Sequence, residues 1–201
     1  MQVRELVESV ASLLLDVSGT RWTSKELRSY LEEGQRKLVE LKPSAYVIEI
    51  SIDLSAGAYQ SLPPDALVLQ DILYNDNDTR DAVTRVVLED LDTVSPSWRV
   101  DNPSAVVQHY VYDMTHPDLF YVYPAQPSDD RGTVRVLVSA VPPKLDTAEQ
   151  TLVLRDKYQP ALIDYMLYKA YQKDNEEPEN RARSNEAYQR FLIALGLRMD
   201  K

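Results

Sequence analysis

The stretch AVVQHYVYDMTHPDLFYVYP, residues 105–124, predicts two β-strands joined by a tight turn. Side chains alternate between two faces over residues 107–114 and again over residues 119–123, and most are aromatic or β-branched, which is typical of strands. Between the two runs, Pro117 fixes φ at a corner of the turn, and the side chain of Asp118 can bond to nearby backbone. We therefore expect a β-hairpin whose bulky residues begin a sheet core.

Similar strand patterns lie on both sides of this hairpin. Apolar and polar residues alternate over residues 46–54, and shorter apolar runs end at turn signals such as Pro63-Pro64. We expect further strands at residues 46–54, 58–62, 67–74, 84–87 and 133–141, and a helical turn at residues 88–92. Short strands separated by turns over about a hundred residues predict a small antiparallel β-sandwich or barrel.

Amphipathic helices flank this β region. Apolar residues recur every three or four positions over residues 3–17, which predicts one helix. Residues 23–26 have the pattern of a capping box before a second helix that ends at Pro43. Two more helices follow Pro160, with a break at residues 175–178.

These patterns predict an α+β fold with two domains. Residues 1–44 and 157–201 form a helical bundle, and residues 45–156 form an antiparallel β domain inserted between its halves. The net charge of −10 is uneven, because the middle segment has eighteen acidic and seven basic residues while the flanking segments are close to neutral. This distribution argues against a protein that grips phosphate backbone, which needs clustered Lys and Arg. Two interpretations remain: a well-solvated acidic domain, or an acidic wall that repels DNA.

The sequence shows no catalytic or cofactor-binding motif. Its five glycines are far apart, which excludes glycine-rich phosphate loops and the nucleophile elbow, and its lack of cysteine excludes thiolate zinc sites. Residues 76–81 begin like a calcium loop, but Asp81 stands where glycine is needed and Val87 where glutamate is needed. His109 and His116 cannot by themselves form a typical zinc site, and we expect both on the surface. We expect no enzyme activity, cofactor or metal, and a glycosidase-type carboxylate pair stays open as an alternative.

Export and membrane insertion are not indicated either. No apolar run reaches the roughly 18 residues that a membrane helix needs. Glu5 and Glu8 make the N-terminus unlike a signal peptide. We therefore expect a protein that is made and used without export.

Tyrosine is unusually common, with thirteen residues against two phenylalanines. These side chains either lie at the edge of a core with each hydroxyl in water, or form contacts between subunits, where tyrosine is enriched. We expect an assembly interface on the C-terminal helices formed by Tyr158, Tyr165, Tyr168, Tyr188, Phe191 and Leu195.

The chain contains YVYDMTHPDLFYVYPAQP at residues 110–127 and, further on, a segment from LRDKYQPALIDY to AYQRFLIALG at residues 154–196. Both segments resemble the head-to-tail adaptor proteins of short-tailed bacteriophages, the neck or tail-completion proteins of the tail tubular protein A type, and the resemblance extends along most of the chain. It implies a structural virion protein of the neck, made in the host cytoplasm. It further implies a dodecameric ring that docks to the portal protein and receives the tail nozzle protein. DNA would pass through the ring without sequence-specific binding, and no membrane would be involved.

In such a ring, the helical domain would form the ring and the portal contact, and the acidic excess of the β domain would line or rim the DNA path. Fixed cations would bind phosphates, whereas carboxylates would keep the DNA hydrated and sliding. We expect the path to be lined by Asp76, Asp78, Asp81, Glu89, Asp90 and Asp92.

A different interpretation is a small β-sandwich module that recognises a cell-surface glycan through tyrosine and tryptophan. A free-standing glycan-binding domain has no need of long amphipathic helices at both ends, whereas a ring subunit does. The flanking helices therefore favour the adaptor.

Overall fold

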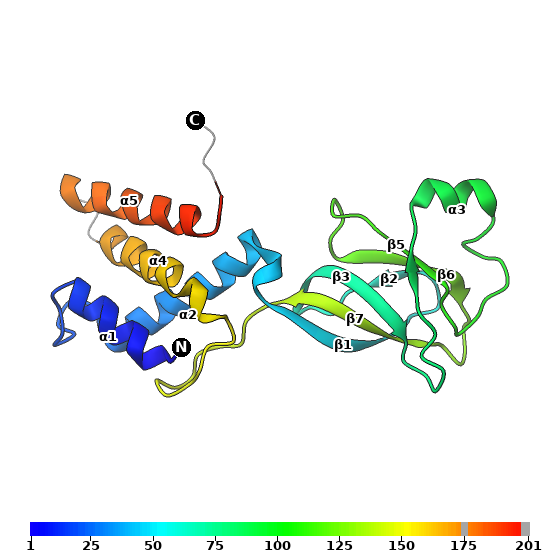
Figure 1. The fold of residues 1–201 in the computed structure, drawn as a ribbon, viewed down its shortest axis with the longest axis horizontal. Helices are drawn as coiled ribbons and strands as arrows, with labels where there is room; N and C mark the ends of the chain where they lie inside the picture. Colours follow the sequence, from blue (N-terminus) through cyan, green and yellow to red (C-terminus); the bar gives the residue numbers. More distant parts are fainter. Residues whose placement is uncertain (174–176, 198–201) are drawn as a thin grey trace. The chain divides into compact units, whose positions relative to one another are not determined.

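The computed structural model describes residues 1–173 and 177–197 of the chain (Figure 1). Part of the predicted helix break at residues 175–178 lies outside these residues. The predicted α+β class is confirmed, since helices at both ends of the chain accompany β-sheets in its middle.

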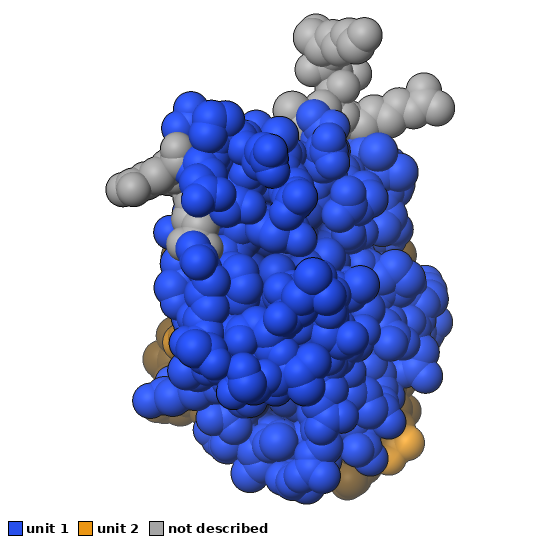
Figure 2. Space-filling model, turned by 90° about the vertical axis from the view of Figure 1, so that its left-hand side faces the viewer, with its two compact units in different colours: residues 1–46, 142–201 blue, residues 47–141 orange. Residues whose placement is uncertain are grey.

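The chain divides into two units. Residues 1–46 and 142–201 form the first, which we call the helical unit, and residues 47–141 form the second, the β-unit. Figure 2 colours the two units separately.

The helical unit packs its helices around α4. Its described helices are α1 (Val3–Leu13), α2 (Ser24–Leu41), α4 (Gln159–Gln172) and α5 (Pro178–Ala194), with short 3-10 turns at Pro43–Ala45 and Asp156–Tyr158. Because α4 packs against α5, α2 and α1, its apolar residues are covered on several sides. The largest fully buried apolar side chains of this unit are Leu6, Leu27, Leu31, Leu38, Leu162, Met166 and Phe191.

The start of α2 follows the sequence prediction, and the end of α1 does not. The Thr23 hydroxyl accepts a hydrogen bond from the Glu26 N–H at 3.2 Å and so caps α2. The apolar pattern predicted that the first helix extends to Val17, but α1 ends at Leu13. The reason is that Leu15 has a φ of 57°, in the left-handed region, and turns the chain out of the helix.

The absence of a side chain at Gly34 allows α2 to pack closely against Tyr165 on α4. A Cβ added at Gly34 would lie 2.9 Å from Cδ1 of Tyr165, which is closer than side chains pack. The glycine that interrupts the apolar pattern of α2 therefore leaves room for the ring of a tyrosine on α4.

The second junction between the units lies at residues 141 and 142, whereas the sequence placed it at residues 156 and 157. Residues 142–155 belong to the helical unit as irregular chain with a turn at residues 148–149. The N–H of Val3 donates to the Gln150 carbonyl at 3.0 Å, and the N–H of Leu152 donates to the Met1 carbonyl at 3.0 Å. These hydrogen bonds join residues far apart in the chain, so no local sequence pattern could predict that residues 142–156 pack with the N-terminus.

The β-unit is a sandwich of two sheets. Its strands are β1 (Val47–Asp53), β2 (Gly57–Ser61), β3 (Ala66–Asn75), β4 (Thr84–Arg85), β5 (His109–Tyr112), β6 (Leu119–Gln126) and β7 (Thr133–Ala140), and α3 (Leu88–Val94) lies between β4 and β5. The sheet orders are β1-β7-β3 and β2-β6-β5-β4. Side chains from both sheets, among them Ile52, Val136 and Phe120, form one buried core.

The predicted hairpin is confirmed as β5 and β6, which pair antiparallel with Val111 opposite Tyr121. The predicted antiparallel arrangement is confirmed, with one exception that the sequence did not predict, since β4 pairs with β5 in parallel. Parallel neighbours need a long crossover connection. The segment with α3 and the following loop, between Arg85 and His109, supplies it.

That crossover also covers part of the outer face of the four-stranded sheet. Trp98 is fully buried there against Leu91, Val111 and Ala125. Its indole Nε1–H donates to Oδ1 of Asp92 at 2.8 Å, so the polar edge of the ring has a partner.

Candidate assembly surface

Four of the six predicted interface residues lie inside the helical unit. Tyr158, Tyr165, Phe191 and Leu195 are each at most 5% exposed. The rings of Tyr165 and Phe191 meet edge to face with centroids 5.2 Å apart, so they join α4 to α5. The dense apolar pattern of these helices is therefore accounted for by packing within one subunit.

The hydroxyl of Tyr165 shows how a buried tyrosine is kept neutral. It donates to Oε1 of Glu33 at 3.1 Å, and the same carboxylate oxygen accepts from Nζ of Lys169 at 2.9 Å. Burial, together with the nearby Glu33 carboxylate, raises the pKa of Tyr165 well above its ordinary value. The hydrogen bond from Tyr165 on α4 to Glu33 on α2 holds these two helices together.

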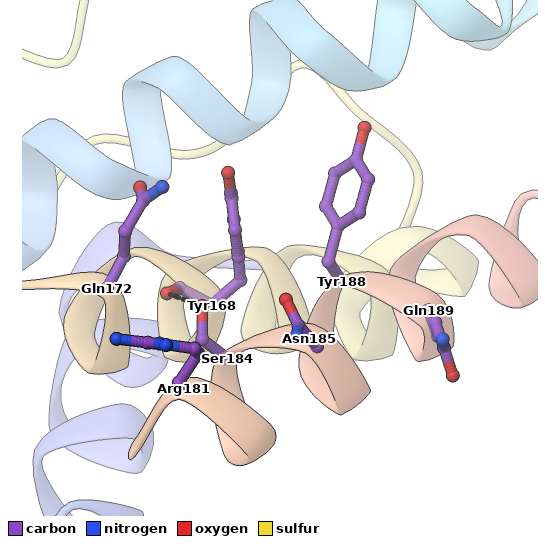
Figure 3. Close-up of a pocket in the computed structure, with 7 residues that line it drawn as sticks. All are labelled: Tyr168, Gln172, Arg181, Ser184, Asn185, Tyr188 and Gln189. Carbon is purple, nitrogen blue, oxygen red and sulfur yellow. Dashed lines mark hydrogen bonds between the residues drawn. The ribbon is translucent and has the colours of Figure 1, made fainter. Parts of the chain in front are cut away.

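The other two predicted residues, Tyr168 and Tyr188, reach the surface. Their ring centroids are 4.8 Å apart, and Figure 3 shows the two rings pointing the same way from α4 and α5. Together with polar neighbours they line a cavity of about 350 Å³, whose walls are Tyr168, Gln172, Arg181, Ser184, Asn185, Tyr188 and Gln189.

The chemistry of this cavity suits a protein partner. Aromatic walls receive an apolar side chain, and the amides of Asn185 and Gln189 offer donors and acceptors to a neighbouring backbone. The Ser184 hydroxyl is turned inward, since it donates to the Tyr168 carbonyl at 3.1 Å. Tyrosine and arginine are enriched among interface anchors, and both residue types line this cavity.

Two of the predicted acidic residues are paired within the β-unit. Asp76 accepts from the Ser51 hydroxyl at 2.6 Å and forms an ion pair with Arg135 at 2.9 Å. Asp92 forms an ion pair with Arg99 at 2.7 Å beside its bond to Trp98. These hydrogen bonds and positive charges lower the pKa of both carboxyls.

The remaining four predicted acidic residues, Asp78, Asp81, Glu89 and Asp90, are exposed. Asp78 and Asp81 lie in the turn after β3, and Asp81 accepts a hydrogen bond from Thr79. Glu89 and Asp90 lie in the first turn of α3. The six predicted acidic residues thus lie in two places of the β-unit, three in the turn after β3 and three in α3.

The units differ sharply in charge. The β-unit has fifteen acidic and five basic residues, whereas the helical unit has seventeen of each. The β-unit therefore carries the whole net charge of −10.

Over residues 1–173 and 177–197, no group of three or more His, Cys, Asp or Glu side chains could hold a metal ion. No helix within the same residues is both long and apolar enough to cross a membrane. His109 stacks on Tyr123 with ring centroids 6.1 Å apart, while His116 is exposed at the hairpin turn.

Sequence reasoning missed two surfaces. One is a groove of about 630 Å³ on the β-unit, between residues 85–89 and the end of the β5–β6 hairpin around Met114. The other is the end of α1 and the loop after it, where Leu13, Leu15 and Val17 are exposed. The apolar pattern placed Leu13 and Val17 on a buried helix face, whereas Leu15 was not part of that pattern.

A family model described as SU10 adaptor protein matches the chain over residues 1–201. No curated protein matches the sequence.

Proposed function

Since the chain belongs to the SU10 adaptor protein family, we propose that it is a structural protein of the bacteriophage virion neck, a head-to-tail adaptor that joins the portal to the tail nozzle. The observation that carries this proposal is the family match, because it covers both units from end to end. Membership of an adaptor family points to a structural role and to contacts with other neck proteins rather than to catalysis.

In its finer form, the proposal is a dodecameric ring through which DNA passes. Subunits in such a ring meet through heterologous contacts that close by rotation. We assign the ring contact and the portal contact to the helical unit. Its equal numbers of acidic and basic residues support this assignment, since copies can approach without net repulsion.

We assign the DNA path to the β-unit. Its excess of ten acidic residues supports a surface that DNA does not adhere to, because binding to phosphates requires fixed cations. The exposed residues Asp78, Asp81, Glu89 and Asp90 are the strongest candidates for the lining. Asp76 and Asp92 contribute less, because Arg135 and Arg99 partly neutralise them.

The ring is tested by particle mass. The purified protein is measured at increasing concentration, alone and with the portal ring of the same phage. We expect a complex with the mass of the portal plus a closed ring of this chain. A protein that stays monomeric under all these conditions would contradict the proposal.

The DNA path is tested by charge reversal. Lysine replacements at Asp78, Glu89 and Asp90 are compared with a control set of lysines elsewhere on the same unit, namely Asp65→Lys, Asp118→Lys and Asp129→Lys, all at exposed positions. Both sets change the net charge equally. We expect slower DNA ejection from particles with the first set only, and equal ejection from both would exclude these residues from the path.

A further inference from the structure

Strand β1 is an open edge of the β-unit. It lies at one end of the three-stranded sheet, whose order is β1-β7-β3, so β7 is its neighbour on one side (Figure 1). Its seven residues pair with β7 without any shift of register. On its other side, no strand lies next to it within the residues that the structure describes. Such an unpaired edge is a template for another strand.

The backbone of alternate residues points out of this edge. The N–H of Leu54 donates to the Gly132 carbonyl at 3.0 Å, and every second residue of an antiparallel ladder bonds in the same direction. Residues 48, 50 and 52 therefore bond to β7, and the residues between them turn their N–H and C=O groups outward. These outward residues, which we call the edge residues, are Val47, Glu49, Ser51 and Asp53. All four are exposed, and none of the described residues bonds to their backbone groups.

The other edges of the two sheets are interrupted or short. β3 shifts register three times against β7, β2 shifts once against β6, and β4 has only two residues. Bulges and short edge strands are devices by which natural proteins prevent further pairing. β1 has no bulge, no proline and no lysine, so its edge is free to pair.

Polar side chains on β1 bond over their own sheet and leave the edge uncovered. The Asp53 carboxylate accepts from the Thr133 hydroxyl on β7 at 2.7 Å. The Ser51 hydroxyl donates to Asp76, which follows β3, at 2.6 Å. A strand can therefore approach the edge without displacing these side chains.

The inner face of β1 specifies apolar residues in an added strand. Ile48 and Ile50 pack against the sandwich core, yet both are only partly buried. Side chains alternate between the two faces of a strand, and neighbours on one face pack together. Apolar residues at every second position of the added strand would complete the cover of these two isoleucines.

The outer face of β1 specifies basic residues between the apolar ones. The carboxylates of Glu49 and Asp76 share one cation, since they lie 3.7 Å and 2.9 Å from the Arg135 guanidinium. Asp53 has no cationic partner among the described residues. Lysine or arginine on the same face of the added strand would balance this negative charge.

A second copy of the chain is a poor match for this edge. Two β1 strands that paired with each other would bring Glu49 and Asp53 of both copies together, and like charges on neighbouring strands are destabilising. The other edges that a second copy offers are interrupted or short. The matching strand therefore belongs to a different protein.

We propose that β1 binds an extended segment of another protein by β-augmentation, a segment with apolar residues at alternate positions and lysine or arginine between them. Main-chain hydrogen bonds to the edge residues supply the affinity, and the alternation supplies the selectivity. The site goes beyond the proposed adaptor role, because it rests on the β-unit alone and exists with or without a ring.

The first test adds a synthetic peptide to the full-length protein. The probe is a fluorescein-labelled peptide in which four valines alternate with four lysines, and binding is followed by fluorescence anisotropy. The control peptide has the same residues in two blocks, valines first, and therefore the same charge. We expect at least tenfold weaker binding of the control. Equal binding would mean simple attraction between charges and would overturn the proposal.

The second test asks whether the peptide backbone is used. In a strand, the N–H groups of alternate residues point to opposite sides, so methylation of the valine amides and methylation of the lysine amides block opposite edges. We expect one methylated peptide to bind like the parent peptide and the other at least tenfold more weakly. An added antiparallel strand is blocked by methyl groups on lysine, and a parallel one by methyl groups on valine. Equal binding of both methylated peptides would overturn the proposal.

The third test measures amide hydrogen exchange along β1. In the free protein, the N–H groups of the edge residues should exchange faster than those of residues 48, 50 and 52, which bond to β7. Saturation with the alternating peptide should slow exchange at the edge residues at least tenfold. Unchanged exchange there would place the peptide elsewhere and contradict the proposal. Slow exchange without peptide that increases with protein concentration would instead show pairing between copies.

The last test changes one edge residue. The N–H of Ser51 bonds to nothing in the described chain, so Ser51→Pro removes no hydrogen bond of the β1–β7 ladder. Binding of the alternating peptide should weaken at least tenfold. Ser51→Ala is the matched control, since it loses the same hydroxyl contact with Asp76, keeps the N–H and should bind like the parent. Parent-like binding by Ser51→Pro would overturn the proposal. If Ser51→Pro does not fold, the methylated peptides decide the question with the parent protein.

Discussion

The helical unit and the β-unit each enclose an apolar core, yet their surfaces differ. The helical unit is neutral, and it exposes Leu15 and Val17 in the loop after α1 and a cavity with Tyr168 and Tyr188 in its wall. The β-unit carries the whole net charge of −10, with exposed carboxylates in the turn after β3 and in α3. A neutral surface with exposed apolar side chains suits contact between copies of a protein. An acidic surface suits solvation and the repulsion of phosphate. The comparison teaches that the net charge of the whole chain conceals one neutral unit and one strongly acidic unit.

The first prediction concerns the independence of the two cores. Phe191 and Phe120 are both fully buried, one in each unit. Either change to alanine removes a large ring and leaves a cavity, so each should lower the unfolding free energy of its own unit by about 3–5 kcal/mol. The other unit should unfold as before.

The chain provides its own probes for this experiment. Trp22 lies in the helical unit and Trp98 in the β-unit, 8% and 0% exposed respectively. Denaturant unfolding followed by fluorescence in Trp22→Phe and Trp98→Phe backgrounds therefore reports each unit alone. A common shift of both transitions by either alanine variant would mean that the chain unfolds as one cooperative body.

The second prediction concerns the close packing of α2 on α4. Alanine at Gly34 would gain about 1 kcal/mol of helix propensity. However, its Cβ would lie 2.9 Å from the ring of Tyr165, which is only 4% exposed and packed against Phe191. Overpacking costs about 1–3 kcal/mol, so Gly34→Ala should destabilise the helical unit by about 1 kcal/mol.

A double variant identifies the cause. Tyr165→Leu removes the ring that the new methyl group meets, so Gly34→Ala should cost less in that background. The control is Ser29→Ala at an exposed position of the same helix, where only the propensity acts and a small gain is expected. Equal costs of Gly34→Ala with and without the Tyr165 ring would refute the steric explanation.

Local signals account for the parts of the fold that the sequence predicted. Pro117 and its neighbours predicted the β5–β6 hairpin, and Thr23 predicted the start of α2, because a turn or a cap is determined by a few adjacent residues. The segment at residues 142–156 and the parallel β4–β5 pair depend on partners distant in sequence. Periodicity carries no information about such partners.

The same limit applies to the candidate site. An apolar or aromatic residue on a helix shows the same pattern whether it packs inside its subunit, as Tyr165 does, or reaches the surface, as Tyr188 does. Leu15 was missed for a different reason. It lies outside the apolar stripe predicted for residues 3–17, and its positive φ marks the position where the chain leaves α1.

The last prediction, the smallest in size, concerns an ion pair beside the loop that joins α1 to α2, between Glu26 and Lys173 at the end of α4. Glu26 on α2 lies 2.9 Å from Nζ of Lys173, which also donates to the Arg21 carbonyl at 2.9 Å. Burial acts to raise the pKa of Glu26, but hydrogen bonds from Lys173 and Tyr30 outweigh it and hold that pKa below its ordinary value. Glu26→Gln should lower the unfolding free energy at neutral pH by about 0.5 kcal/mol, typical of a partly exposed pair.

The pH dependence gives this small effect a signature. Because folding lowers the pKa of Glu26, the stability it contributes is present above the pKa of the unfolded chain and is lost as the pH falls through the lower folded value. The difference between parent and Glu26→Gln should therefore shrink below about pH 4. Glu40→Gln is the control, since that carboxylate is 55% exposed and pairs with Lys37 on its own helix. A Glu26→Gln effect that persisted unchanged at low pH would show that the glutamine disturbs packing, and the ion pair would then have no part in holding the loop.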